Sequence, residues 1–146
     1  MSSLKQQYVV PATRLSYAGA RLALEAAVAE AAVLGVPVNV SVCDDGGHQM
    51  AFARMDGAPL LSADIAVDKA FSVVAFSGLP TSRWFDLIKG EPALREGIVH
   101  RDRLVIFGGG VPLVVDGQLV GAVGVSGGSA DQDVAIASAG ASAVAA

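Results

Sequence analysis

Apolar residues between positions 13 and 34 recur every three or four residues, which places them on one face of an α-helix. They are Leu15, Ala18, Leu22, Ala26, Ala29 and Val33. The pattern predicts a helix over Thr13–Leu34 with Thr13 as its N-cap. Gly35 and Pro37 should end it, because glycine accepts the left-handed conformation that follows a helix and proline cannot continue one.

The period changes to two at Val38, which is typical of β-structure. We expect a strand over Val38–Cys43, a tight turn over Asp44–Gly47 and a return strand over His48–Met55. In the return strand the alternation puts His48 and Arg54 on the same face.

A second helix is predicted over Ser62–Phe76, with an apolar stripe in which Lys69 takes a central position. Thr81 is expected to cap a shorter helix that ends at Gly90. The charged segment Glu91–Arg103, interrupted by proline and glycine, is predicted to be a loop with one helical turn at most.

Two short strands are expected over Leu104–Phe107 and Leu113–Val115. The three glycines between them, Gly108–Gly110, indicate a bulge or a close approach of backbone. Asp116–Gly117 is a strong signal for a two-residue hairpin turn into a further strand, Gln118–Val125.

The C-terminal part begins with a capping-box pattern, because Ser129 is followed three positions later by Gln132. The alanine-rich segment after it is expected to be helical. The predicted order is therefore α-β-β-α-α-β-β-α, with hairpins joining paired strands. This order predicts an α+β fold, a central antiparallel sheet flanked by helices, and 146 residues are enough for a single domain.

Composition narrows the function. A formal net charge of −4 leaves no excess of positive charge for phosphates, so nucleic acid is not expected as a partner. No stretch approaches the ~20 apolar residues of a membrane span. With 53% hydrophobic and 16% charged residues, a monomer would expose apolar surface, so we expect a homo-oligomer. The first residues lack the apolar core of a secretory signal, and the single cysteine forms no internal disulfide, which favours the cytoplasm.

His48 and Lys69 are the two candidate reactive side chains. A lone histidine is often a hydrogen-bonded structural group, and Lys69 could equally pair with Asp64 or Asp68, or extend to the surface. Cys43 ends an apolar strand and is expected to be a buried, small apolar residue.

The stretch from Gly124 to Ser129 runs from a strand into a helix start, where free N–H groups favour an anion. Either Gly127, Gly128 and Ser129 bind a carboxylate or phosphate, or the glycines serve only the turn. Two distant histidines and one cysteine argue against a structural zinc site. A phosphate-binding P-loop and the serine-hydrolase elbow are also absent from the sequence.

Taken together, several motifs resemble the GlcG/HbpS family, which also occurs as the C-terminal domain of PduO-type proteins. These motifs are Gly35-Val36-Pro37-Val38, Asp45-Gly46-Gly47-His48, Arg54-Met55-Asp56-Gly57-Ala58-Pro59, Asp68-Lys69-Ala70, Gly108-Gly109-Gly110-Val111-Pro112, and Gly121-Ala122-Val123-Gly124-Val125-Ser126-Gly127-Gly128 with Gln132-Asp133. The resemblance implies a profilin-like fold and assembly into dimers or larger rings. It also implies that His48 is the candidate for haem ligation or acid–base work, with Lys69 on the helix that would face it.

Two functions follow as alternatives. In the first, the protein is a cofactor-free enzyme of lyase or isomerase type on a small aromatic or carboxylate-bearing metabolite, such as a hydroxylaminobenzoate. His48 and Lys69 would then be catalytic, and Arg54, Gly127, Gly128 and Ser129 would bind substrate. In the second, it is a haem-binding sensor or carrier with His48 as axial ligand. No cofactor other than haem is implied. For the enzyme, a pocket shared between subunits is expected.

Overall fold

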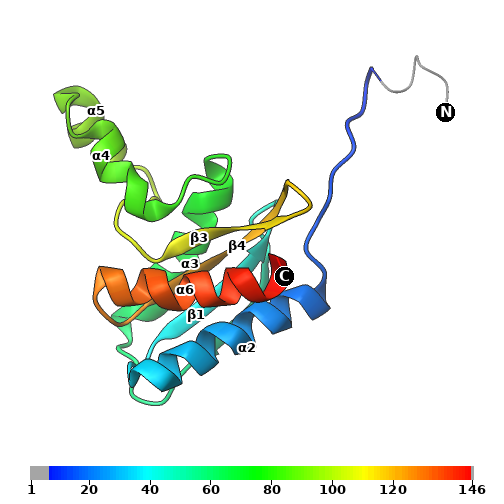
Figure 1. The fold of residues 1–146 in the computed structure, drawn as a ribbon. Coiled ribbons are helices and arrows are strands. Elements are labelled where there is room, and N and C mark those ends of the chain that lie inside the picture. The colour runs from blue at the N-terminus through cyan, green and yellow to red at the C-terminus, as the bar shows by residue number, and fades with distance from the viewer. Residues whose placement is uncertain (1–6, 146) are drawn as a thin grey trace.

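The computed structural model describes residues 7–145 and has the α+β architecture that the sequence predicts (Figure 1). Four strands form one antiparallel sheet in the order β2-β1-β4-β3. Helices α2 and α6 cover one face of this sheet, and α3 covers the other. The elements are α2 (Tyr17–Leu34), β1 (Asn39–Asp44), β2 (Gln49–Arg54), α3 (Leu61–Ala75), η1 (Thr81–Arg83), α4 (Trp84–Ile88), α5 (Pro92–Ile98), β3 (Gly110–Val115), β4 (Gln118–Ser126) and α6 (Ala130–Ala145).

The first helix begins four residues later than predicted, and Ser16 is its N-cap in place of Thr13. Ser16 has an extended backbone, and its hydroxyl accepts a hydrogen bond from Gly19 N at 3.0 Å. The backbone N–H of Leu15 donates to the carbonyl of Val120 in β4, so the chain is still tied to the sheet there. The predicted end is confirmed, because Gly35 adopts the left-handed conformation with φ 71°.

Strand β1 is buried along its whole length, although four of its six side chains are polar or sulfur-bearing. It lies between β2 and β4 in the sheet and is covered by helices on both faces. Its register pairs Asn39 with Arg54 and Ser126 at one end, and Asp44 with Gly121 at the other. The two polar clusters described below lie near these two ends of β1.

The segment between α3 and β3 differs most from the prediction. Residues 104–107 form no strand, because the N–H of Val105 donates to the hydroxyl of Ser72 on α3 and not to a neighbouring strand. Part of the predicted loop is instead α5, with Pro92 in its first turn. Thr81 provides no cap to the helix after it, since its hydroxyl accepts from Gly110 N. In Figure 1, α4 and α5 form an arm that projects from the body of the domain.

Two local predictions in the C-terminal half are confirmed. Asp116 and Gly117 both have positive φ, 50° and 76°, as a type I′ hairpin turn requires. At the start of α6, Ser129 N donates to the Gln132 side chain, and Gln132 N donates to the Ser129 hydroxyl. These reciprocal bonds are the capping box.

The core is built from small aliphatic side chains, which lets helices approach the sheet closely. At Gly124 in β4, an added Cβ atom would collide with the backbone oxygen of Ala66 in α3. The close contact of α3 with β4 therefore depends on this glycine. Within residues 7–145, the helices are too short or too polar to cross a membrane.

Candidate functional site

Lys69 lies in the middle of α3 and is buried, with 1% of its surface exposed. Its Nζ donates to the carboxylate of Asp133 on α6 at 3.0 Å and to the carbonyl of Val125 in β4 at 2.8 Å. The ring of Phe107 lies 5.2 Å from Nζ. The lysine pairs with neither Asp64 nor Asp68, and it does not reach the surface, so both of those alternatives are wrong.

The glycines at 108–110 make this arrangement possible. Gly109 has φ 132°, and a Cβ atom there would lie 2.5 Å from Lys69 Nζ and would also collide with the carbonyl oxygen of Val125. The close backbone approach predicted from the sequence is thus confirmed, and what it approaches is the buried ammonium. Glycine is needed because any side chain at position 109 would displace the lysine.

The second oxygen of Asp133 accepts a hydrogen bond from Gly128 N at 2.9 Å. The carboxylate therefore joins the Lys69 ammonium to the turn that precedes α6. Since the N–H of Ser129 is bound to Gln132, the N–H groups of Gly128 and Ser129 both already have acceptors within the chain. A ligand anion at this helix start would have to compete with Asp133.

Burial lowers the pKa of Lys69 below its usual value, and the attraction of Asp133 opposes this shift without cancelling it. The ammonium is thus easier to deprotonate than one in water. Its hydrogen bonds to Asp133 and Val125 satisfy two of its three donors.

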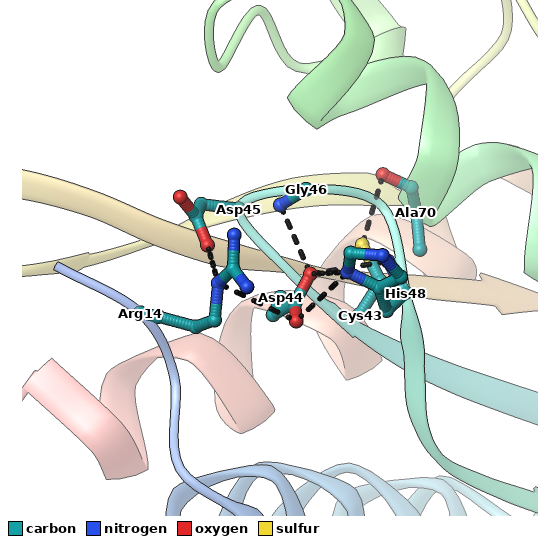
Figure 2. Close-up of polar contacts among 7 residues, drawn as sticks. All are labelled: Arg14, Cys43, Asp44, Asp45, Gly46, His48 and Ala70. Atoms are coloured by element: carbon teal, nitrogen blue, oxygen red, sulfur yellow. Dashed lines mark hydrogen bonds and ion pairs between the residues drawn. The ribbon is translucent and has the colours of Figure 1, made fainter. Parts of the chain in front are cut away.

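The opposite end of β1 carries a second carboxylate cluster, centred on Asp44 (Figure 2). Asp44 is buried and accepts hydrogen bonds from the backbone N–H groups of Gly46 at 2.9 Å and His48 at 3.1 Å. The Nδ1 atom of the His48 ring lies 3.0 Å from the same oxygen. Arg14 lies on the other side, 3.7 Å from Asp44 and 2.7 Å from Asp45. The Asp44–Gly47 turn is therefore organised around one carboxylate.

Burial alone would raise the pKa of Asp44, but the hydrogen bonds from His48 and Gly46 outweigh it and hold the pKa below its usual value. The carboxylate stays ionised and fixes the orientation of the imidazole. The His48 side chain is 68% exposed. Because Nδ1 is engaged by Asp44, the Nε2 atom is the ring nitrogen left for a ligand.

Arg54 lies at the end of β2 that pairs with Asn39, five residues along β1 from Asp44. Its guanidinium donates to the carbonyl of Ala58 at 2.9 Å and so closes the loop that follows β2. At about 3.4 Å per residue, this end of β1 lies roughly 17 Å from the end that carries His48.

Lys69 and the Gly127–Ser129 turn lie at the same end as Arg54, because Val125 and Ser126 pair with the first residues of β1. One chain therefore brings Lys69 together with Gly128 through Asp133, and keeps His48 apart from them. A pocket that contains His48, Arg54 and Lys69 requires a second copy of the chain and stays a prediction.

Sequence reasoning noted the motifs that contain Asp44 and Asp133 but gave neither carboxylate a role in the site. Asp133 follows Ser129 by four positions, and the first turn of a helix is where an acidic side chain can bind the preceding N–H groups. Asp44 precedes His48 by four positions across a glycine turn, which was the available signal for its contact with the imidazole. The distance between this cluster and Lys69 could not be predicted from the spacing of residues in the sequence.

Cys43 lies beside this second cluster and is buried, as predicted. Burial raises the pKa of its thiol to about 12, and the sulfur donates to the carbonyl of Ala70. It is therefore not a nucleophile at neutral pH. In the part of the chain that the structure describes, no cluster of three or more histidine, cysteine or acidic side chains is arranged to hold a metal ion.

The fold and these two clusters define an α+β domain of profilin-like architecture with one buried and one exposed polar centre. Residues 15–142 match the model of the family described as haem degrading protein HbpS-like. The chain belongs to this family, and the resemblance to GlcG/HbpS proteins is confirmed.

Three relatives illustrate the family. The corrinoid adenosyltransferase PduO of Salmonella typhimurium is 41% identical over 113 residues, which are 77% of this chain and 33% of PduO. The chain thus spans about a third of that protein. The crystal structure of a PduOC:heme complex has a TM-score of 0.81 and 36% identity, covering 90% of this chain and 95% of that one. Klebsiella pneumoniae ORFY has a TM-score of 0.86 and 30% identity, covering 100% and 97%.

Proposed function

We propose that this protein binds haem, with His48 as an axial ligand to the iron. The observation that carries the proposal is the exposed imidazole whose Nδ1 is held by the buried Asp44 carboxylate at 3.0 Å. Metal-ligating histidines usually have their second ring nitrogen bonded to a carboxylate or carbonyl in this way, which fixes the ring and raises its basicity. The crystal structure of the related PduOC:heme complex supports the proposal.

The residues around His48 fit such a ligand. An added Cβ atom at Gly46 would lie 2.9 Å from the His48 ring, so the glycine leaves room for the imidazole. At Gly47, a Cβ atom would meet the ring of Phe71, which supplies apolar surface beside the turn. Haem brings an iron that takes up ligands and electrons, and the protein sets its axial ligand and its surroundings.

The exposed side of His48 needs cover, because a haem ring is apolar and a single chain leaves the imidazole 68% exposed. We propose that a second copy of the chain supplies this cover. Exposed apolar side chains are available for such assembly, among them Phe52, Leu60, Leu61, Phe85 and Leu87. Haem binding and oligomer formation would then be coupled.

A haem titration of the purified protein tests the proposal. His48→Ala should abolish the saturable Soret shift that the wild type gives. His100→Ala is the matched control, since these are the two histidines of the chain and His100 is exposed in another segment. An unchanged spectrum in His48→Ala, with unchanged stoichiometry, would show that the imidazole is not the ligand.

The cofactor-free enzyme is a second candidate, favoured by the lowered pKa of the buried Lys69. Such a lysine gives up its proton more readily than one in water. In this proposal Lys69, which is buried in a single chain, becomes accessible when the substrate binds. It then acts with the partner copy's imidazole on a small aromatic or carboxylate-bearing substrate, and Arg54 with the Gly127–Ser129 turn binds the substrate's carboxylate. Turnover of a hydroxylaminobenzoate, followed by chromatography without added haem, tests it. Arg54→Gln should raise KM while His100→Ala leaves it unchanged, and the absence of any turnover would reject this candidate.

A further inference from the structure

A cavity of about 370 Å³ lies between the C-terminal half of α3 and the α4–α5 arm. We propose that this cavity is a binding site for a small neutral aromatic molecule that carries a carbonyl oxygen. Its volume is within the range of small-molecule sites. Neither His48 nor Lys69 lines it, and Phe71 is the residue that it shares with the surroundings proposed for haem.

The walls are mainly aromatic and aliphatic. Phe71, Phe76 and Trp84 contribute rings, and Ile98 and Leu104 contribute aliphatic surface. The rings of Phe76 and Trp84 lie 4.8 Å apart at an interplanar angle of 52°, which is a favourable tilted arrangement. A planar aromatic ligand matches such walls, because it can pack on ring faces and edges at low entropic cost.

The cavity is held in shape by contacts from α3 to the segment around residue 103. Ser72 is buried, and its hydroxyl lies 2.9 Å from the carbonyl of Arg103 and accepts from the N–H of Val105. The Arg103 guanidinium pairs with Asp68 at 3.1 Å and lies over the Phe71 ring at 3.8 Å. The far wall is therefore fixed to the helix, and the Ser72 hydroxyl is fully used by the protein.

One polar group in the wall lacks a partner. Trp84 is 2% exposed, and its indole Nε1–H has no hydrogen-bond acceptor among residues 7–145. A buried donor without an acceptor costs free energy, so a ligand that supplies an acceptor oxygen gains affinity there. The Nε1 atom itself is buried, so the proposal requires Phe76, which packs on Trp84 and is 51% exposed, to turn aside when the ligand binds.

The charges at the rim favour a neutral ligand. Arg101 and Asp102 both line the cavity and both are exposed, so the rim carries one positive and one negative charge. An ionised ligand would lose water on entering the aromatic walls without a matching net charge. A carbonyl group needs only the indole donor, and an amide could also donate to Asp102.

The probe is benzamide, followed through tryptophan fluorescence, since Trp84 is the one tryptophan of the chain. We expect a saturable change in emission with benzamide at millimolar concentration or below, because a ligand of this size can reach an affinity in that range. Benzoate and benzylamine, the anionic and cationic counterparts, should bind at least several-fold more weakly. Absence of a saturable signal with benzamide, in fluorescence and in calorimetry, would overturn the proposal.

Three variants locate the site, measured by calorimetry. Trp84→Phe keeps the aromatic wall and removes the donor, so benzamide affinity should fall about three- to tenfold while toluene affinity stays within twofold. Ala75→Phe, at an exposed lining position, should block all ligands without disturbing the core. Phe85→Leu, on the same helix as Trp84 but outside the cavity lining, is the matched control and should bind normally.

The results separate this proposal from that for haem. His48→Ala should bind benzamide as the wild type does, because His48 is not part of the cavity wall. Equal loss of benzamide and toluene in Trp84→Phe, in a protein that remains folded by circular dichroism, would contradict the role of the indole donor. Unchanged binding in Ala75→Phe would show that benzamide binds elsewhere.

Discussion

A buried carboxylate pairs with a basic side chain near each end of strand β1, and the two pairs serve different purposes. At one end, Asp133 pairs with Lys69, and both side chains are buried. At the other, Asp44 is equally buried, but its partner His48 is mostly exposed. In each case a carboxylate also accepts backbone N–H groups from a glycine turn, Gly128 in the first and Gly46 in the second.

The difference lies in what remains available after the pair has formed. Lys69 is surrounded by protein atoms, so its charge holds α3, β4 and α6 together. His48 is held on one side only, and its other ring nitrogen faces outward. A buried pair is suited to fixing a structure, whereas a half-buried pair presents a positioned group to a ligand.

Removing the lysine should have the largest effect. Lys69→Met leaves the Asp133 carboxylate buried without its counter-ion, which should lower the free energy of unfolding by about 3–5 kcal/mol. The double variant Lys69→Met with Asp133→Asn should recover more than half of this loss, because asparagine keeps an acceptor for Gly128 N. Denaturant unfolding measures both, and a loss below about 1 kcal/mol in Lys69→Met would contradict the buried-pair description.

Neutralising the other carboxylate should cost less. Asp44→Asn weakens the hydrogen bonds to Gly46 and His48 and should lower the free energy of unfolding by about 1–3 kcal/mol at neutral pH. The folded pKa of Asp44 is below its ordinary value of 3.8, so its stabilisation is present above that value and is lost as pH falls through the folded pKa. Unfolding measured across the acid range should show a shallower pH dependence in Asp44→Asn.

A substitution in the turn before α6 tests the region around Lys69 without removing a charged side chain. Ser129→Ala removes the hydroxyl that accepts from Gln132 N and should cost about 1 kcal/mol, as helix N-caps do. Thermal unfolding by circular dichroism measures the loss. A decrease as large as that of Lys69→Met would mean that the cap, and not the ion pair, holds α6 in place.

The smallest effect is expected at the exposed partner. His48→Ala should change the free energy of unfolding by no more than about 0.5–1 kcal/mol, because the imidazole is mostly in solvent and Asp44 keeps its backbone donors. Chemical denaturation compared with His100→Ala checks this. A loss of several kcal/mol would place His48 with Lys69 as a structural group and remove the contrast between the two ends.

Much of the fold could be predicted because local signals and the final structure agree. The hairpin at Asp116–Gly117 and the capping box at Ser129 depend on neighbours within three residues. The prediction was wrong where a distant group takes over a backbone donor. The N–H of Leu15 donates to the carbonyl of Val120, and α2 begins only after this residue. The N–H of Val105 donates to the hydroxyl of Ser72 in the segment where a strand was expected.

The site could be predicted only as separate residues. The position of Lys69 in an apolar stripe indicated a buried charge, but its partner lies 64 residues away in sequence, beyond the reach of helix spacing. The grouping of His48, Arg54 and Lys69 also depends on strand register, which places His48 at the end of β1 opposite to the other two. The resemblance to a known family identified candidate site residues, but it did not predict how far apart they lie in the structure.

The order of the strands also decides how the sheet can grow. Both β2 and β3 are edge strands, and β3 carries two features that hinder pairing with a further strand. Its Gly110 N–H is already bound to Thr81, and Pro112, two residues on and on the same outer side, has no N–H to offer. Strand β2 contains no proline, so its sequence lacks this protection against a further strand.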